Sequence, residues 1–268
     1  MICDLNVPWP RTDYSSPTGS EILSLKKQLA ILEELGYTHI ALNFTLDQGV
    51  KLPSGNVNPI DLKLVQEFQS RLKIFTRVTL IIDDVSSHQG LSKLNTSFDL
   101  ISVIPRSEKA LQLAASNLEI DLISLPFHQR LPFYLKHKTV CSATDRGVLF
   151  EINYGDMISD DLKRRNFFGN VKGLIRASRK RGMVLSSGTS DPLSLRGSFD
   201  AVNLLVVLGL DYSRAQATVT EQPTKALLNG RLRLKSHKQA VVMGTDILND
   251  SENIGHKRRK VETIVDRI

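Results

Sequence analysis

Short apolar runs alternate along this chain with longer stretches in which apolar positions recur every three or four residues. The short runs are apolar on both faces, which is typical of strands buried within a parallel sheet. They predict seven strands, at residues 2–7, 39–44, 78–82, 98–103, 121–125, 148–152 and 183–187.

The stretches with helical periodicity lie between these strands. Ser20 is expected to cap a helix over residues 21–35, and Gly36 ends it. Ser107 is expected to cap a second helix that continues to residue 118. The other predicted helices cover residues 60–73, 91–95, 131–137, a basic crossover segment ending near 181, 198–208, 213–220 and 224–228.

This order predicts an α/β fold built by parallel strand–helix repetition. A closed barrel is favoured over an open dinucleotide-binding sheet, because no G-x-G-x-x-G motif follows the first strand. The pattern contains no convincing eighth strand, so we expect an irregular TIM-like (β/α) barrel with about seven parallel strands over residues 1–230.

The amino-acid composition indicates a soluble domain and a reducing compartment. The chain has 268 residues, of which 41% are hydrophobic and 24% charged, as in ordinary soluble domains. Its two cysteines, Cys3 and Cys141, cannot form a disulfide framework, which favours a reducing compartment. No apolar run is long enough to span a membrane, so no membrane association is expected.

The net charge of +7 is unevenly distributed. Residues 231–268 carry nine Lys and Arg against five Asp and Glu, so this segment alone supplies +4. We predict a basic, flexible extension there. The block Lys257, Arg258, Arg259 and Lys260 is typical of a nuclear-import or nucleic-acid patch, with a solvated tail as the alternative.

A second basic segment, between Lys163 and Arg181, contains eight cations and no acid. Four of its residues recur at helical spacing and predict a stripe that contacts nucleic-acid phosphates, with a solvated outer face as the alternative. The stripe consists of Lys172, Arg176, Arg179 and Lys180. Two single arginines, Arg146 and Arg196, are candidate phosphate ligands or internal salt-bridge partners.

Catalytic motifs are missing from the sequence. The six histidines show no H-x-H or H-E-x-x-H spacing, and the chain has no G-x-S-x-G elbow and no Walker loop. We therefore predict no metal, no cofactor and no catalytic residue. Function in such barrels sits at the carboxyl ends of the strands. The candidates there are Asn6, Arg106, Tyr154, Ser186 and Ser187.

Several ordered motifs resemble one known family. They are DLNVPWP at 4–10, GYTHIA at 36–41, TLIIDD at 79–84, LPFYLK at 131–136, DRG at 145–147 with Glu151 and Tyr154, and LNGRLR at 228–233. Through these motifs the chain resembles the barrel-shaped protein subunit shared by eukaryotic ribonuclease P and ribonuclease MRP.

The resemblance implies a distorted barrel related to metal-dependent phosphoesterases of the polymerase and histidinol phosphatase (PHP) superfamily. Those enzymes carry H-x-H at the end of the first strand, where this chain has Leu5-Asn6-Val7. The family also implies a non-catalytic nuclear and nucleolar subunit that helps to shape the catalytic RNA. Its implied partners are ribonuclease P RNA, MRP RNA, a Pop5-type small subunit and, indirectly, precursor tRNA.

The implied processes are removal of the precursor-tRNA 5′ leader and processing of precursor rRNA. Two alternatives remain open from the sequence. One is a stand-alone metal-dependent phosphoesterase of the PHP type. The other is a protein-interaction module whose basic helix binds an acidic partner.

Overall fold

The computed structural model describes residues 1–47, 50, 52–53, 55–83, 91–158, 160–237 and 241–242. The chain divides into two compact units, Met1–Leu234 and Lys235–Ile268. In its described part, the second unit contains a two-stranded antiparallel pair, β8 (Ser236–His237) and β9 (Val241–Val242). The sites described below belong to the first unit.

Seven parallel strands form the sheet of the first unit, in the order in which they occur along the chain. Their apolar residues are buried on both faces, which explains the short apolar runs of the sequence. The strands are β1 (Cys3–Pro8), β2 (His39–Leu46), β3 (Lys73–Ile82), β4 (Leu100–Pro105), β5 (Leu122–Ser124), β6 (Leu149–Asn153) and β7 (Met183–Ser186). The predicted TIM-like barrel is confirmed.

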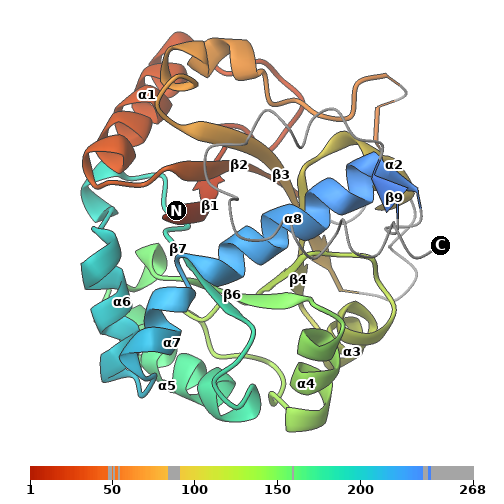
Figure 1. Ribbon diagram of the computed structural model, residues 1–268, viewed down its shortest axis with the longest axis vertical. Helices are drawn as coiled ribbons and strands as arrows, with labels where there is room; N and C mark the ends of the chain where they lie inside the picture. Colours follow the sequence, from red (N-terminus) through yellow and green to blue (C-terminus); the bar gives the residue numbers. More distant parts are fainter. Residues whose placement is uncertain are drawn as a thin grey trace, which may run out of the picture. The chain divides into compact units, whose positions relative to one another are not determined.

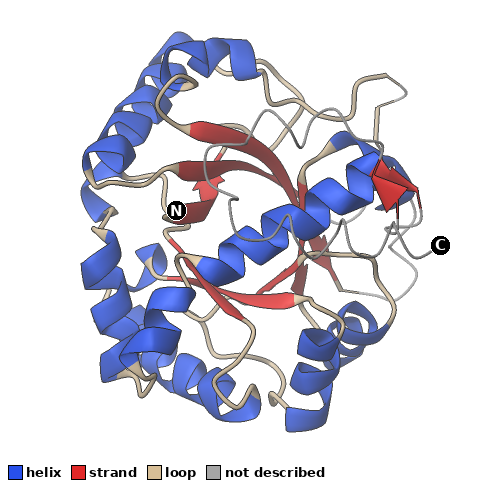
Figure 2. Cartoon of the chain, in the orientation of Figure 1, coloured by secondary structure: helices blue, strands red, loops and turns tan. Residues whose placement is uncertain are grey.

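Helices cover the outer side and one end of the barrel (Figures 1 and 2). They are α1 (Gly19–Glu34), the 3₁₀ helix η1 (Leu62–Phe68), α2 (Leu91–Ser97), α3 (Glu108–Ser116), α4 (His137–Asp145), the 3₁₀ turn η3 (Gly155–Met157), α5 (Asp161–Ala177), the 3₁₀ turn η4 (Pro192–Ser194), α6 (Ser198–Val207), α7 (Tyr212–Ala217) and α8 (Glu221–Lys235). Within the described residues, no helix is both long and apolar enough to cross a membrane.

Backbone from outside the sheet closes the barrel between β7 and β1. The N–H of Leu185 donates to the carbonyl of Thr218 at 3.1 Å, and the N–H of Cys3 donates to the carbonyl of Val219 at 2.9 Å. The turn between α7 and α8 therefore satisfies edge groups that an eighth strand would otherwise pair.

Helix α8 lies across the amino-terminal end of the barrel (Figure 1). Leu227 belongs to a buried apolar cluster with Leu5, Leu100 and residues near the amino-terminal ends of other strands. At Gly230 the approach is so close that a Cβ atom would lie 2.1 Å from the carbonyl oxygen of Asp99. Only glycine allows this contact. Through this contact and the apolar cluster, α8 closes the amino-terminal end of the barrel.

An ion pair fixes the far end of the same helix. The guanidinium of Arg233 lies 2.7 Å from a carboxylate oxygen of Asp121, and it also donates to the carbonyls of Phe98 and Asp99. The sequence predicted a helix only over residues 224–228 and ended the barrel domain at residue 230. Helix α8 continues to Lys235, because these contacts extend past that boundary.

The prediction for residues 60–73 is wrong in its second half. Strand β3 begins at Lys73, five residues before the predicted strand, and pairs with β2 from His39 through Leu46. This full-length ladder stabilises the extended backbone of residues 73–77 more than a helix would. The helix expected there is the short η1.

Two other helix boundaries also differ from the prediction. The helix predicted at 131–137 does not form; α4 begins at His137 instead, where Val140 and Ala143 supply its buried face. Thr18, rather than Ser20, stands at the start of α1. Its N–H donates to Oε2 of Glu21 at 2.8 Å, as in a capping box.

Candidate functional site

An ion pair lies inside the barrel, in the half toward the carboxyl ends of the strands. The guanidinium of Arg77, on β3, donates to both carboxylate oxygens of Glu151, on β6, at 2.5 and 2.6 Å. Both side chains have no exposed surface. Burial opposes ionisation of Glu151, but the adjacent Arg77 charge and its hydrogen bonds hold the pKa of that carboxyl below its usual value.

Polar side chains from several strands surround this pair. Ser186 donates to Oε1 of Glu151 at 2.8 Å, and the amide of Asn6 donates to Oε2 at 3.3 Å. The side-chain amide of Asn43 donates to Oδ1 of Asn6 at 2.7 Å, and the hydroxyl of Thr79 donates to Oδ1 of Asn43 at 2.6 Å. The network is therefore connected across the barrel, and its members satisfy one another.

Asp4, on β1, is buried but only partly hydrogen-bonded. Its Oδ1 accepts from the N–H groups of Asn6 and Ser187, each at 3.1 Å, but its buried Oδ2 has no hydrogen-bond partner. Burial raises the pKa of Asp4 above its ordinary value, because the charged form loses its hydration.

This interior does not fit the divalent metal centre of PHP enzymes. Within the described residues, no three His, Cys, Asp or Glu side chains come together as metal ligands. The position that follows Asp4 and Leu5 is an amide, Asn6, and the Glu151 carboxylate is occupied by Arg77. A buried guanidinium repels a divalent cation, so these donors suit an internal ion pair instead.

The structure brings together three of the five predicted strand-end residues. Asn6, Ser186 and Ser187 lie in the interior network, and Ser187 donates to the carbonyl of Asn6 at 3.3 Å. Tyr154 is buried, and its hydroxyl accepts from the N–H of Arg196 at 3.1 Å. Arg106 is exposed and lies 3.9 Å from Asp47, away from that network.

The two single arginines donate mainly to backbone carbonyls. Arg146 donates to the carbonyls of Ala115 and Leu118 at 2.9 and 2.8 Å, and more weakly to that of Ala114, so it caps the carboxyl end of α3. Arg196 donates to the carbonyls of Leu193 and Leu195, both at 2.8 Å. RNA or partner binding by either residue stays a prediction.

The predicted basic stripe is only partly helical. Lys172 and Arg176 are exposed on α5, but this helix ends at Ala177. Arg179 and Lys180 lie beyond it with φ of 52° and 62°, so the helical spacing does not extend to them. Lys180 pairs with Asp211 at 3.3 Å, which supplies an acid that the local sequence lacks. Residues 257–260 lie outside the described residues.

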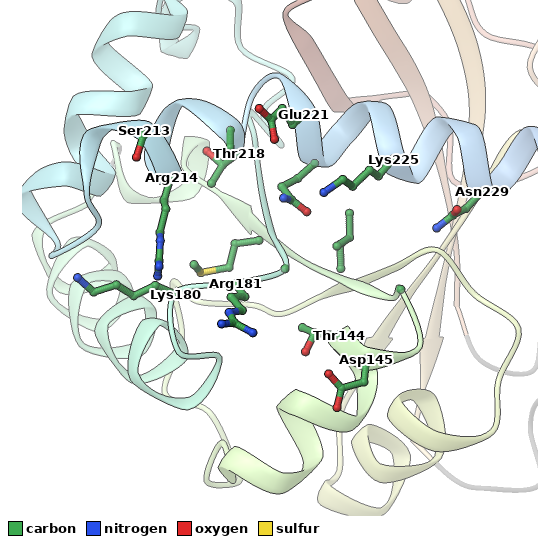
Figure 3. A pocket seen from close by; sticks show the side chains of 16 residues that line it. Thr144, Asp145, Lys180, Arg181, Ser213, Arg214, Thr218, Glu221, Lys225 and Asn229 are labelled. Carbon is green, nitrogen blue, oxygen red and sulfur yellow. The ribbon is translucent and has the colours of Figure 1, made fainter. Parts of the chain in front are cut away.

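A cleft of about 690 Å³ opens at the other end of the barrel (Figure 3). One wall contains the residues that precede β6 and β7, and the other is formed by α7 and α8. Its charged lining residues are Asp145, Lys180, Arg181, Arg214, Glu221 and Lys225. The sequence singled out only Lys180 among these as a binding residue.

Arg77 was also missed by the sequence prediction, and Glu151 was quoted only as part of a motif. The signal for Arg77 was an arginine directly before an apolar strand, but nothing local to it pointed to Glu151. Cys3 is fully buried, and burial raises the pKa of its thiol to about 12.

Comparison with known proteins adds independent evidence. The model of the family described as RNase P subunit p30 matches residues 1–235. The chain is 44% identical over 266 residues to ribonuclease P/MRP protein subunit RPP1 of Saccharomyces cerevisiae, covering 95% of this chain and 91% of that protein. It is 37% identical over 238 residues to probable ribonuclease P protein subunit 3 of Schizosaccharomyces pombe, covering 89% and 97%.

A solved structure shares the fold. A chain in the cryo-EM structure of archaeal ribonuclease P with mature tRNA superposes with a TM-score of 0.62 at 16% identity, over 91% of this chain and 99% of that one. At this identity the likeness concerns the fold, and it supports the irregular barrel described above.

Proposed function

The chain belongs to the RNase P subunit p30 family, and on that premise we propose that it is a protein subunit of ribonuclease P and ribonuclease MRP. The observation that carries the proposal is the 44% identity to a ribonuclease P/MRP subunit over 95% of this chain. As such a subunit, it takes part in removal of the precursor-tRNA 5′ leader and in precursor-rRNA processing.

Within the complex, we assign the chain a structural rather than a catalytic role. The support is the Arg77–Glu151 pair, which uses the carboxylate and the space at which a barrel hydrolase would hold its metal. Catalysis then belongs to the RNA, and the protein binds and shapes that RNA. A stand-alone phosphoesterase is disfavoured by the same pair.

Two kinds of partner follow from this role. The first is the RNA of each complex, for which the exposed Lys172 and Arg176 on α5 offer one surface. The second is protein, including a Pop5-type small subunit. Exposed apolar side chains support a protein contact at η4 and α6, where Leu193 is 83% and Phe199 70% exposed. Precursor tRNA is an indirect partner.

We further propose that the chain acts in the nucleus and nucleolus. The support is the basic sequence at residues 257–260, which is typical of nuclear-import signals. Fluorescent tagging of the full chain, with and without glutamine at these four positions, tests the assignment. Unchanged nuclear accumulation of the variant contradicts this role for the block.

Co-purification tests the proposed function most directly. The tagged full chain is recovered from cells, its bound RNA is sequenced, and cleavage of a precursor tRNA is assayed. We expect ribonuclease P RNA and MRP RNA together with leader removal. Recovery of the chain without either RNA contradicts the proposal.

The non-catalytic role has a separate test. The purified chain is incubated with Mn²⁺, Mg²⁺ or Zn²⁺ and a generic phosphodiester, and we expect no turnover above the buffer rate. Metal-dependent turnover that Asp4→Asn abolishes would establish the phosphoesterase alternative.

The predicted stripe is tested by a triple variant to glutamine of Lys172 and Arg176, on α5, and of Arg179, which lies beyond its end. If these residues contact phosphates, binding to the cognate RNA weakens, and its salt dependence flattens by ~0.9 in slope for each lost duplex contact. Unchanged binding across the salt series removes the stripe from the RNA surface.

A further inference from the structure

We propose that the cleft at the amino-terminal end of the barrel binds the phosphodiester backbone of an RNA strand. The cleft lies between the residues that precede β6 and β7 and the helices α7 and α8. This inference rests on the proposed function, because it gives the RNA a second surface besides Lys172 and Arg176 on α5. Figure 3 shows the cleft from close by.

The charge of the cleft favours an anion. Its lining includes four cations, Lys180, Arg181, Arg214 and Lys225, against the two carboxylates of Asp145 and Glu221. Lys180 and Arg214 share one acid outside the cleft lining, Asp211, at 3.3 and 3.7 Å. Arg181 and Lys225 form no ion pair within the described part of the chain. Two cations thus remain available for phosphate groups.

These two cations come from different walls. Lys225 extends from α8, and Arg181 lies on the turn between α5 and β7 (Figure 3). The two walls are held together by the bond from Leu185 to Thr218 and by close packing of Asn229 near Gly147. A strand that enters the cleft can therefore be contacted from both sides at once.

The backbone of the turn is itself unusual. Arg179 and Lys180 are two successive non-glycine residues in the left-handed region, which costs about 1–2 kcal/mol per residue. Helices commonly end with glycine in this conformation. Here the turn holds three consecutive cations, Arg179, Lys180 and Arg181, of which the last two line the cleft. Left-handed residues of this kind cluster at functional sites.

The exposure of the charges favours a polymer over a small anion. A site for a small molecule encloses its ligand and places a few polar groups around it. In this cleft Arg181, Arg214 and Lys225 are all exposed. An open, cationic trough suits a chain that passes through it and contacts it with successive phosphates.

The remaining lining groups favour RNA over DNA. Asp145 and Asn229 provide oxygen acceptors beside the cations, and both are exposed at the cleft. A ribose 2′-hydroxyl is a hydrogen-bond donor that deoxyribose lacks. Acceptors beside phosphate-binding cations therefore match the alternating chemistry of an RNA backbone.

The experiment measures binding of the full chain to short fluorescein-labelled oligouridylate and oligothymidylate probes across a salt series. The cleft variant is Arg181→Gln with Lys225→Gln. The matched control is Lys109→Gln with Lys138→Gln, which removes two exposed cations on α3 and α4 outside the cleft. Thermal unfolding of each variant checks that the fold is retained.

We expect the cleft variant to bind oligouridylate about tenfold more weakly and to lose about 1.4 from the salt slope, at ~0.7 for each single-strand contact. The control variant should stay within about twofold of the unsubstituted chain. The unsubstituted chain should prefer oligouridylate to oligothymidylate. Ultraviolet crosslinking of the purified ribonucleoprotein should place RNA on peptides that contain Arg181 or Lys225.

Two results overturn the cleft assignment. One is a cleft variant that binds like the control. The other is an unsubstituted chain that does not bind the probe and gives no crosslink in these peptides, although ribonuclease P RNA co-purifies with it. Equal affinity for both probes overturns the assignment to RNA. Recovery of the chain without ribonuclease P or MRP RNA is a different failure, because it contradicts the proposed function itself.

Discussion

Arg77 and Glu151 form a two-bond ion pair inside the barrel, although 74 residues separate them in the sequence. The pair lies in the half of the barrel toward the carboxyl ends of the strands, where the active sites of such barrels lie, and its exposed surface is zero. Asn6 and Ser186 donate to the same carboxylate. The barrel interior is thus a closed internal network, and surfaces outside it remain for binding partners.

Breaking this pair should destabilise the chain strongly. Glu151→Gln leaves the Arg77 charge buried without its counterion, which typically costs about 3–5 kcal/mol. Denaturant unfolding followed by circular dichroism measures the change. The control is the double variant Arg77→Met with Glu151→Leu, which removes both charges and should recover much of the loss. A single variant as stable as the unsubstituted chain contradicts a structural role for the pair.

The effect of Asp4 on the stability of the fold should depend on pH. Its raised pKa means that the folded chain binds a proton at this carboxyl more tightly than the unfolded chain does. Ionised Asp4 therefore lowers the stability near neutral pH, and the penalty disappears as pH falls through the folded pKa toward the unfolded value. Asp4→Asn keeps an oxygen acceptor for Asn6 and Ser187 but carries no charge.

The expected result is that Asp4→Asn is about 1–3 kcal/mol more stable than the unsubstituted chain near pH 7, because the neutral amide avoids the desolvation cost of a buried carboxylate. The difference should shrink as the pH is lowered. Denaturant midpoints over a pH series measure it. A variant that is less stable than the unsubstituted chain at neutral pH, but as stable as that chain in acid, would show that Asp4 stabilises the fold in its charged form.

The contact of α8 with the barrel depends on Gly230. A methyl group there would meet the carbonyl of Asp99 at 2.1 Å, so Gly230→Ala must displace the helix. We expect a loss of about 3 kcal/mol, at the upper end for overpacking. Gly173→Ala is the matched control on α5. Its Cβ would meet nothing within 4 Å, so the better helix propensity should add about 1 kcal/mol. Equal thermal shifts for both variants contradict the tight packing of α8.

The barrel could be predicted from the sequence because strands buried on both faces produce continuous apolar runs. Its interior network could not be predicted. Arg77 lies between the helix predicted to end near residue 73 and the strand predicted to begin at residue 78, whereas β3 begins at Lys73. Closure of the sheet brings Glu151, on β6, to Arg77, on β3, and no local sequence pattern encodes that contact.

The length of α8 was underestimated for a related reason. Its inner face meets strand ends through Gly230 and Arg233, so a polar residue and a glycine occupy positions where helical periodicity expects apolar ones. The cleft residues Arg214 and Lys225 also belong to separate helices. Only the folded chain places them beside Arg181.

Arg146 should act mainly on stability. Its guanidinium donates to carbonyls at the end of α3, so Arg146→Met should cost about 1–3 kcal/mol through lost charged hydrogen bonds. Arg196→Met is the control, because that side chain bonds only to carbonyls of its own loop within the described contacts. Unfolding free energies and RNA salt slopes are measured together. A stable Arg146→Met variant with a reduced salt slope would instead identify Arg146 as a phosphate contact.

The left-handed turn after α5 allows charge and strain to be separated at one position. Arg179 has φ of 52°, where glycine is unstrained and alanine is not. Arg179→Gly and Arg179→Ala remove the same charge, so their difference in unfolding free energy reports the backbone alone. We expect the glycine variant to be more stable than the alanine variant by about 1 kcal/mol. We also expect both to weaken RNA binding equally, if the charge of Arg179 contributes to it. An alanine variant as stable as the glycine variant would mean that the left-handed backbone at Arg179 carries no strain.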